Sequence, residues 1–281
     1  MKYLVTGATG GFGKYALEYL EELVPKGDIY ALVRSEEKGA SLIAKGFKLR
    51  IADYGNPMEM ETALEGIDRL LFVSGAPGNR QAEHQNVINA AQKAGVNYTV
   101  YTSFPKADQA THPLAEDHLY TEKALKAAQL NYTSVRNNWY LENELPLIEA
   151  AIHSGDFKHI VNNSKAGWAL KREYAQAAVN ILVSNNYREV VELSGKPITY
   201  QELVAALNQA TGKQLTVSSV DEQSFMESLE ASGLPPHTAE LFVMFEQVIA
   251  QNQLDVVSAD FERVLNQPLT PLVKAFEEIL N

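Results

Sequence analysis

Short apolar segments alternate with amphipathic ones along the first 136 residues of the chain. The apolar segments are rich in β-branched, aromatic and leucine residues, which predicts β-strands. They span Tyr3–Thr6, Ile29–Val33, Lys48–Ile51, Arg69–Val73, Tyr98–Tyr101 and Tyr132–Arg136. The intervening segments predict helices near Gly11–Leu23, Glu36–Ala44, Pro57–Glu65, Arg80–Lys93 and Ala115–Ala128. This alternation predicts an α/β fold of the Rossmann type, with a doubly wound parallel sheet covered on both faces.

The pattern changes beyond about Arg136. Segments become mostly helical, with short strand candidates at Val190–Leu193 and Leu215–Val217 and several prolines between elements. We therefore expect the α/β part over residues 1–150 and a smaller, mostly helical C-terminal lobe over residues 151–281. No linker separates them, so the lobe is interpreted as interleaved with the α/β part and not as an independent domain.

A glycine-rich turn, TGATGGFG over residues 6–13, joins the first predicted strand to the first predicted helix. Gly7 permits a tight turn, Gly10 lets the backbone approach a pyrophosphate, and Gly13 lets the helix pack closely on the strand. The helix N-terminus also attracts phosphate. A glycine-rich loop without a ligand is the alternative, but the strand–helix junction favours a dinucleotide site. Its candidate binding residues are Gly7, Thr9, Gly10, Gly11, Phe12 and Gly13.

Three further positions follow predicted strands and are candidate cofactor contacts. Arg34 follows the second strand, where NAD-specific folds usually carry an acidic residue. Its guanidinium suits a 2′-phosphate, which favours NADPH over NADH, with NADH as the alternative. Asp53 is equally consistent with binding the adenine and with turn or capping chemistry. Ser74 begins a run of small residues that would let the backbone pass a cofactor, although a plain turn fits as well.

Composition narrows the class further. The net charge of −11 disfavours nucleic acid as a partner, because phosphate binding requires clustered basic residues. The absence of cysteine excludes disulfides and thiolate sites, and the scattered histidines indicate no metal site. No apolar run approaches the roughly 18 residues of a membrane span, and no signal peptide is visible. A cytoplasmic protein is the expectation, with its oligomeric state open, a dimer included.

Several blocks resemble one family. They are the glycine-rich turn and the runs at 84–91 (HQNVINAA), 101–103 (YTS), 118–123 (HLYTEK) and 136–143 (RNNWYLEN). Together they resemble the NmrA-like group of atypical short-chain dehydrogenases, within it bacterial NAD(P)H:quinone oxidoreductases and triphenylmethane reductases. The resemblance implies a Rossmann fold, an NADP cofactor and oxidoreductase activity.

Typical short-chain dehydrogenases carry Tyr and Lys four residues apart on one helix. Here Lys123 is present, but Leu119 stands four residues before it and Tyr120 is displaced around the helix. The proton donor that ketone reduction needs is therefore missing. A reduced quinone has an oxygen with a pKa near the ~10 of a phenol, so it needs little acid help. Quinones and cationic dyes are the favoured acceptors.

Lys123 would hold the nicotinamide ribose, and Ser103 would hydrogen-bond near the nicotinamide. Their alternatives are a surface lysine and a strand-end hydroxyl. Exposure is expected for His118, which argues against it as the proton donor. The substrate pocket is predicted from Asn137, Asn138, Trp139 and Tyr140, with aromatic rings as a flat wall and inter-lobe packing as the alternative.

The favoured hypothesis is an NADPH-dependent enzyme that transfers hydride to a quinone-like or other flat acceptor. The main alternative is a non-catalytic redox sensor of the NmrA type, because the tyrosine is missing. An epimerase of the same fold is disfavoured, since that chemistry uses the missing tyrosine as a base.

Overall fold

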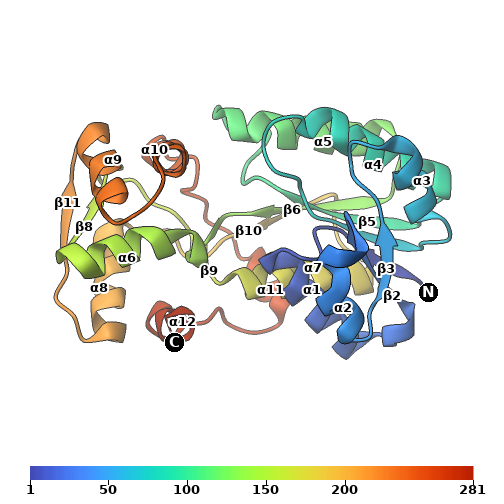
Figure 1. Cartoon of the computed structure of the whole chain (residues 1–281), viewed down its shortest axis with the longest axis horizontal. Coiled ribbons are helices and arrows are strands. Elements are labelled where there is room, and N and C mark those ends of the chain that lie inside the picture. Colours follow the sequence, from blue (N-terminus) through green and yellow to red (C-terminus); the bar gives the residue numbers. More distant parts are fainter. Residues whose placement is uncertain (281) are drawn as a thin grey trace. The chain divides into compact units, whose positions relative to one another are not determined.

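In the computed structural model, which describes residues 1–280, the chain forms two compact units (Figure 1). Unit 1 comprises residues 1–137, 172–193 and 263–266. Unit 2 comprises residues 138–171, 194–262 and those from 267 onward. The units interleave along the chain, and the first passage from unit 1 to unit 2 follows Asn137, ahead of the division expected at residue 150.

Unit 1 is built on a seven-stranded sheet in which every pairing is parallel. The strand order is β10-β6-β5-β4-β1-β2-β3, which confirms the expected α/β fold. The chain reverses its direction of travel between β1 and β4, the switch point at which open α/β sheets bind ligands. The strands are β1 (Tyr3–Val5), β2 (Ile29–Val33), β3 (Lys48–Ile51), β4 (Arg69–Phe72), β5 (Tyr98–Ser103), β6 (Tyr132–Asn137) and β10 (Val190–Leu193).

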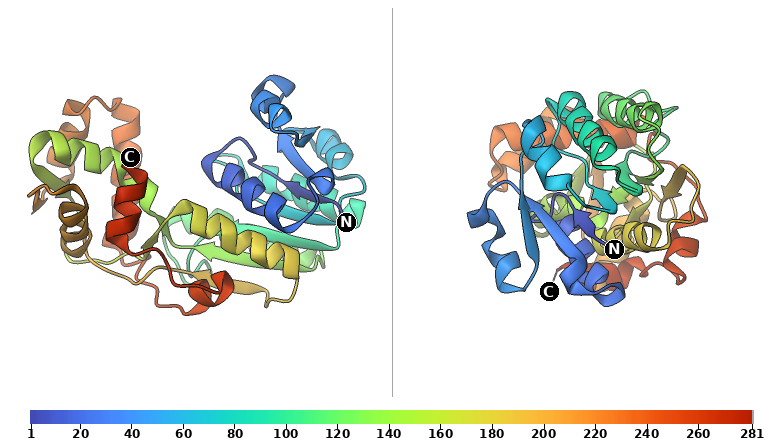
Figure 2. Two further views of the ribbon diagram at one scale, coloured as in Figure 1. Left: turned by 90° about the horizontal axis from the view of Figure 1, so that it is seen from below. Right: turned by 90° about the vertical axis from the view of Figure 1, so that its right-hand side faces the viewer.

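Helices cover both faces of this sheet. In Figure 1, α3 to α5 lie above it and α1, α2 and α7 lie below it, and Figure 2 shows α7 (yellow) running along the strands. The helices are α1 (Gly11–Leu23), α2 (Glu36–Ala44), α3 (Pro57–Leu64), α4 (Arg80–Ala94), α5 (Pro113–Ala127) and α7 (Lys171–Ser184), with a 3₁₀ turn η1 (Lys26–Asp28).

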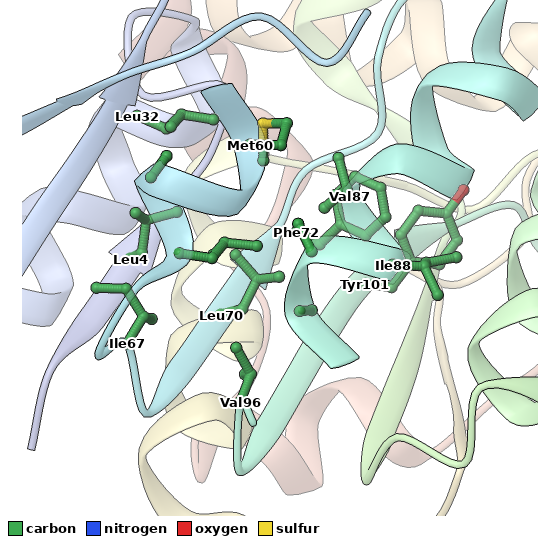
Figure 3. Packing of buried hydrophobic residues seen from close by; sticks show 14 of the residues in the cluster. Leu4, Leu32, Met60, Ile67, Leu70, Phe72, Val87, Ile88, Val96 and Tyr101 are labelled. Atoms are coloured by element: carbon green, nitrogen blue, oxygen red, sulfur yellow. The ribbon is translucent and has the colours of Figure 1, made fainter. Parts of the chain in front are cut away.

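Aliphatic and aromatic side chains fill the layer between the sheet and α3 and α4. Leu4, Leu70 and Phe72 from the strands are fully buried against Met60 and Ile88 from the helices (Figure 3). All four residues of β4 are buried, as expected of a central strand covered on both faces. This packing holds the C-terminal ends of β1 and β4 in place.

One expectation about the C-terminal half is wrong. From the sequence, Val190–Leu193 is predicted to lie in the smaller lobe, but it forms β10, the edge strand beside β6 in the main sheet. Val191 and Leu193 are fully buried, while Val190 and Glu192 are partly exposed. That alternation suits an edge strand, and the sequence alone does not say which sheet the strand joins.

Unit 2 is mostly helical, with two small parallel pairs, β7 with β9 and β8 with β11. No helix in the described part of the chain combines the length and apolar character needed to cross a membrane. The strands are β7 (Trp139–Tyr140), β8 (Asp156–His159), β9 (Trp168–Ala169) and β11 (Thr216–Ser219). The helices are η2 (Leu141–Glu144), α6 (Leu145–Ser154), α8 (Tyr200–Thr211), α9 (Glu222–Ala231), α10 (Pro236–Ala250), α11 (Asp260–Leu265, which unit 1 shares) and α12 (Leu272–Ile279).

Candidate functional site

The turn between β1 and α1 has a geometry that only glycine satisfies. Gly7 has a φ of +58°, in the left-handed region. A Cβ placed on Gly13 would lie 2.2 Å from the carbonyl oxygen of Gly7 and 2.8 Å from Cα of Ala8. The Gly10 N–H donates to the Gly7 carbonyl at 2.9 Å. The turn is therefore tight, and α1 begins directly against it.

The N-terminus of α1 faces solvent and lacks a side-chain cap. Gly10 is its N-cap and makes no side-chain hydrogen bond, and the first turn carries no acidic residue. Gly7, Thr9 and Gly11 are exposed around it, whereas Phe12 and Gly13 are buried. A side chain caps α2, α3, α5, α8 and α9, whereas α4, α6, α10 and α12 lack a side-chain cap as α1 does. An uncapped helix end behind an open glycine turn fits a bound diphosphate.

The loop after β4 lies against this turn. A Cβ on Gly7 would lie 3.2 Å from the side chain of Val73, and the Val73 N–H donates to Thr6 Oγ1 at 2.8 Å. The next residue, Ser74, donates its N–H to Thr102 Oγ1 on β5 at 2.8 Å. The structure thus brings the glycine turn and Ser74 to one edge of the sheet, as the sequence predicts for a dinucleotide site.

Arg34 and Asp53 follow β2 and β3. Arg34 is exposed immediately after β2, beside Ser35, which caps α2. Asp53 Oδ1 accepts from the Gly55 N–H at 2.8 Å, an interaction typical of a turn. Of the two interpretations weighed for Asp53, the turn role is visible, and adenine recognition stays a prediction.

The two candidate catalytic residues, Ser103 and Lys123, are not arranged like the Tyr–Lys pair of typical short-chain dehydrogenases. Ser103 is buried and its Oγ donates to Glu122 Oε1 at 2.6 Å. Glu122 lies on the buried face of α5 and is bound by Arg136 through Nε at 3.0 Å and Nη2 at 2.7 Å. Lys123, the next residue along the helix, is exposed. Because one residue rotates an α-helix by about 100°, the buried polar position beside Ser103 belongs to Glu122.

Glu122 and Arg136 both lie within the blocks that resemble the NmrA-like group, but no motif in the sequence marks either as a site residue. The expected exposure of His118 is also wrong. His118 is 8% exposed, with Nδ1 2.8 Å from Tyr101 Oη and Nε2 bonded to Arg80 at 3.2 Å. Burial, followed by the charge of Arg80, holds its pKa well below the ordinary histidine value.

The four predicted pocket residues divide between the units after β6. Asn137 is the last residue of β6 in unit 1, and the other three belong to unit 2. Asn138 uses Nδ2 to bind Ser194 Oγ and the Leu254 carbonyl, both at 2.9 Å, which indicates a role in fixing loops.

The two aromatic residues differ in exposure. Trp139 is 9% exposed and packs edge-on against Phe245, with ring centroids 5.4 Å apart. Tyr140 is partly exposed, with Lys171 Nζ 5.4 Å from its ring centroid. Packing within unit 2 accounts for Trp139, and an acceptor wall stays a prediction for both rings.

The parallel sheet, its switch point and the glycine turn define a dinucleotide-binding protein of the Rossmann class. Within the described chain, no group of three or more potential ligands is placed to hold a metal ion. The profile of an NAD(P)H-binding family matches residues 7–166.

Two relatives match most of the sequence. Quinone oxidoreductase 2 of Escherichia coli is 35% identical over 99% of this chain and 98% of its own. Its crystal structure with NADPH has a TM-score of 0.92 and covers 99% of this chain and 100% of that one. An NmrA-like oxidoreductase of Aspergillus flavus is 30% identical over 81% of this chain and 77% of its own.

A third similarity is to a solved structure. Triphenylmethane reductase of Citrobacter sp., complexed with NADP(H), has a TM-score of 0.93 at 29% identity, covering 99% of both chains. This chain belongs to the NAD(P)H-binding, NmrA-like family, and it is related over its whole length to NAD(P)H-dependent oxidoreductases.

Proposed function

We propose that the protein is an NADPH-dependent oxidoreductase that reduces a quinone-like or other flat conjugated acceptor. The observation that carries this proposal is the uncapped glycine turn at the switch point, where Gly13 tolerates no Cβ. The bound cofactor would supply a hydride. The chain would hold the diphosphate at the α1 N-terminus, and the family relationship to quinone- and dye-reducing enzymes supports the acceptor class.

Arg34 supports NADPH over NADH. Its exposed guanidinium follows β2, the strand beside β1, and Ser35 next to it caps the following helix α2 by accepting from the Lys38 N–H. An arginine can pair with a 2′-phosphate through two parallel hydrogen bonds, which a 2′-hydroxyl cannot match.

The acid–base chemistry of the site supports a hydride acceptor that does not need a proton donor from the protein. The Ser103 hydroxyl hydrogen is donated to Glu122, so toward a ligand Ser103 can act only as an acceptor. A quinone takes up one hydride and one proton, and its reduced oxygen has a pKa near the ~10 of a phenol. Water can supply that proton. Lys123, exposed on α5, is proposed to hold the nicotinamide ribose.

The test is a titration of NADPH and NADH into the wild type and Arg34→Ala, followed by turnover with a naphthoquinone. Arg34→Ala should weaken NADPH by about tenfold and leave NADH within about twofold. The matched control is Arg188→Ala, an exposed arginine before β10 at the opposite edge of the sheet. Equal losses for both nucleotides would contradict the role of Arg34.

The second candidate function is a redox sensor that binds NADP(H) without turning it over. Two features favour the sensor: the Ser103 hydroxyl already donates its hydrogen to Glu122, and the tyrosine of typical short-chain dehydrogenases is missing. Tight NADPH binding, with no NADPH oxidation across a panel of quinones and dyes, would select the sensor over the enzyme.

A further inference from the structure

Side chains from several elements hold the backbone of the loop Val73–Gly75. Val73 donates its N–H to Thr6 Oγ1 at 2.8 Å, and its carbonyl accepts from Tyr54 Oη at 2.9 Å. Ser74 donates its N–H to Thr102 Oγ1 at 2.8 Å. The loop backbone is therefore held by side chains from other segments, namely the ends of β1 and β5 and the segment after β3.

Helix α4 supplies two further contacts, both to Gly75. The Gly75 N–H donates to Nε2 of His84 at 3.0 Å, and the Gly75 carbonyl accepts from Nε of Arg80 at 2.9 Å. This loop also touches the dinucleotide turn, because Val73 packs against Gly7. A shift of Gly75 would therefore move backbone at the edge of the proposed cofactor site.

The hydrogen-bond partners of His84 determine its protonation state. A backbone N–H can only donate, so Nε2 must be the acceptor and the ring proton must sit on Nδ1. Nδ1 lies 2.8 Å from Thr121 Oγ1, and that hydroxyl donates to the Asp117 carbonyl at 2.8 Å. Every link from Gly75 to Asp117 is satisfied when the imidazole is neutral.

The surroundings of His84 favour the neutral ring. It is fully buried, with its ring centroid 4.7 Å from that of Phe72 and 5.6 Å from that of Tyr101, two residues shown together in Figure 3. Burial, followed by the charge of Arg80, lowers the pKa of His84 to about 3. The acceptor for Gly75 is thus present throughout the neutral range.

We propose that His84 is a positioning residue of the dinucleotide site. It holds the Ser74–Gly75 backbone against the glycine turn and ties that loop to α5 through Thr121. The inference rests on the proposed cofactor site, and it concerns a residue that itself does not contact the reacting atoms. A neutral histidine suits this role because one ring offers an acceptor and a donor on opposite sides.

Two substitutions separate the hydrogen bond from the ring volume. His84→Phe keeps an aromatic ring among Phe72 and Tyr101 but removes the acceptor. His84→Gln loses the ring but keeps an amide oxygen that can accept from Gly75. The control is Asn89→Ala, on the exposed side of the same helix.

NADPH affinity should fall about tenfold in His84→Phe and stay within about threefold in His84→Gln and in the control. Amide hydrogen exchange at Gly75, measured in the free protein by NMR, should accelerate in the Phe variant only. ¹⁵N spectra of the wild-type ring should show the Nδ1-protonated tautomer.

The exchange and tautomer measurements do not depend on cofactor binding, so they test His84 even if the wild type binds no NADPH and the proposed function fails. Unchanged Gly75 exchange in the Phe variant, a Gln variant as impaired as Phe, or the other tautomer would overturn the inference. Should His84→Phe fail to fold, Thr121→Val removes the second link and should weaken NADPH by about threefold.

Discussion

In unit 1 a buried arginine is surrounded by carboxylates, whereas the two most buried carboxyl groups of unit 2 share a phenol. In unit 1, Arg136 binds both oxygens of Glu122, reaches Glu192 Oε1 at 3.1 Å and pairs with Asp108. Burial acts to lower the pKa of Arg136, but Glu122 and then Glu192 outweigh it and hold the pKa above the ordinary value.

In unit 2, Glu144 and Glu246 are each 2% exposed. Glu144 Oε1 accepts from the indoles of Trp139 at 3.0 Å and Trp168 at 2.9 Å. Its other oxygen lies 3.0 Å from Tyr200 Oη, which is also hydrogen-bonded to Glu246. The hydrogen-bond donors around these two carboxyls are neutral groups.

A phenol carries a single hydroxyl hydrogen, so Tyr200 can donate to only one of the two carboxyls. The other contact is a hydrogen bond only when that carboxyl is protonated. Burial raises the pKa of Glu144, and burial together with the charge of Glu144 raises that of Glu246. The unit 1 cluster therefore balances the buried charge of Glu122 with an arginine, and the unit 2 cluster balances its buried carboxyls with a proton.

Removing Arg136 should produce the largest loss in the free energy of unfolding. Arg136→Met leaves buried Glu122 without its cation, and breaking a buried pair in this way costs about 3–5 kcal/mol in the free energy of unfolding. Urea denaturation followed by far-UV circular dichroism measures it, with Arg188→Met as the surface control. Adding Glu122→Gln to Arg136→Met should recover part of the loss. A loss no greater than that of the control would contradict the charge balance assigned to unit 1.

Alkaline pH should weaken unit 2 selectively. Carboxyls with a raised folded-state pKa stabilise fully below the ordinary glutamate value of 4.5, and this stability is lost as pH rises through the raised values. Burial lowers the pKa of His159, whose ring is 5.2 Å from that of Tyr200, so it adds no compensating cation. We expect a loss on the order of 3 kcal/mol between about pH 5 and about pH 9.

The two tryptophans report this change without interference from unit 1. Both Trp139 and Trp168 lie in unit 2 and both bind Glu144, so their fluorescence follows the unfolding of this unit and the ionisation of that carboxyl. Fluorescence-detected urea curves across the pH range provide the measurement. A flat pH dependence would show that unit 2 holds no shared proton.

Glu246→Gln should flatten that dependence, because the amide supplies hydrogens at every pH and adds no second negative charge. We expect the loss between about pH 5 and about pH 9 to shrink by about 1–2 kcal/mol relative to the wild type. The control is Glu240→Gln, an exposed position on the same helix. An unchanged slope in Glu246→Gln would assign the titration to another group.

These clusters also show which features a sequence can reveal. The glycine turn is local, so the spacing of Gly7, Gly10 and Gly13 suffices to predict it. Residues 144, 200 and 246 meet only through tertiary packing, and nothing in their neighbours in the sequence signals a shared proton. The helix α5 shows a third case, in which His118 and Glu122 face inward because buried partners satisfy them. Apolar periodicity counts such residues as outward-facing, so it gives no signal of the buried position of Glu122, whereas Lys123 is found by the spacing of the dehydrogenase Tyr–Lys pair.

Removing one neutral hydrogen-bond donor from each cluster should give a direct test of the comparison. Ser103→Ala deletes the hydroxyl bound to Glu122, which keeps both hydrogen bonds from Arg136, so we expect about 0.5–1 kcal/mol. Trp168→Phe deletes the matching donor to Glu144, which has no cation to hold its charge, so we expect about 2 kcal/mol. Ser103→Thr, which keeps a hydroxyl, and a tryptophan-independent far-UV measurement are the controls. Equal losses of unfolding free energy in the two variants would mean that Arg136 does not compensate Glu122 for the lost hydrogen bond. The distinction between a cluster balanced by an arginine and one balanced by a proton would then be wrong.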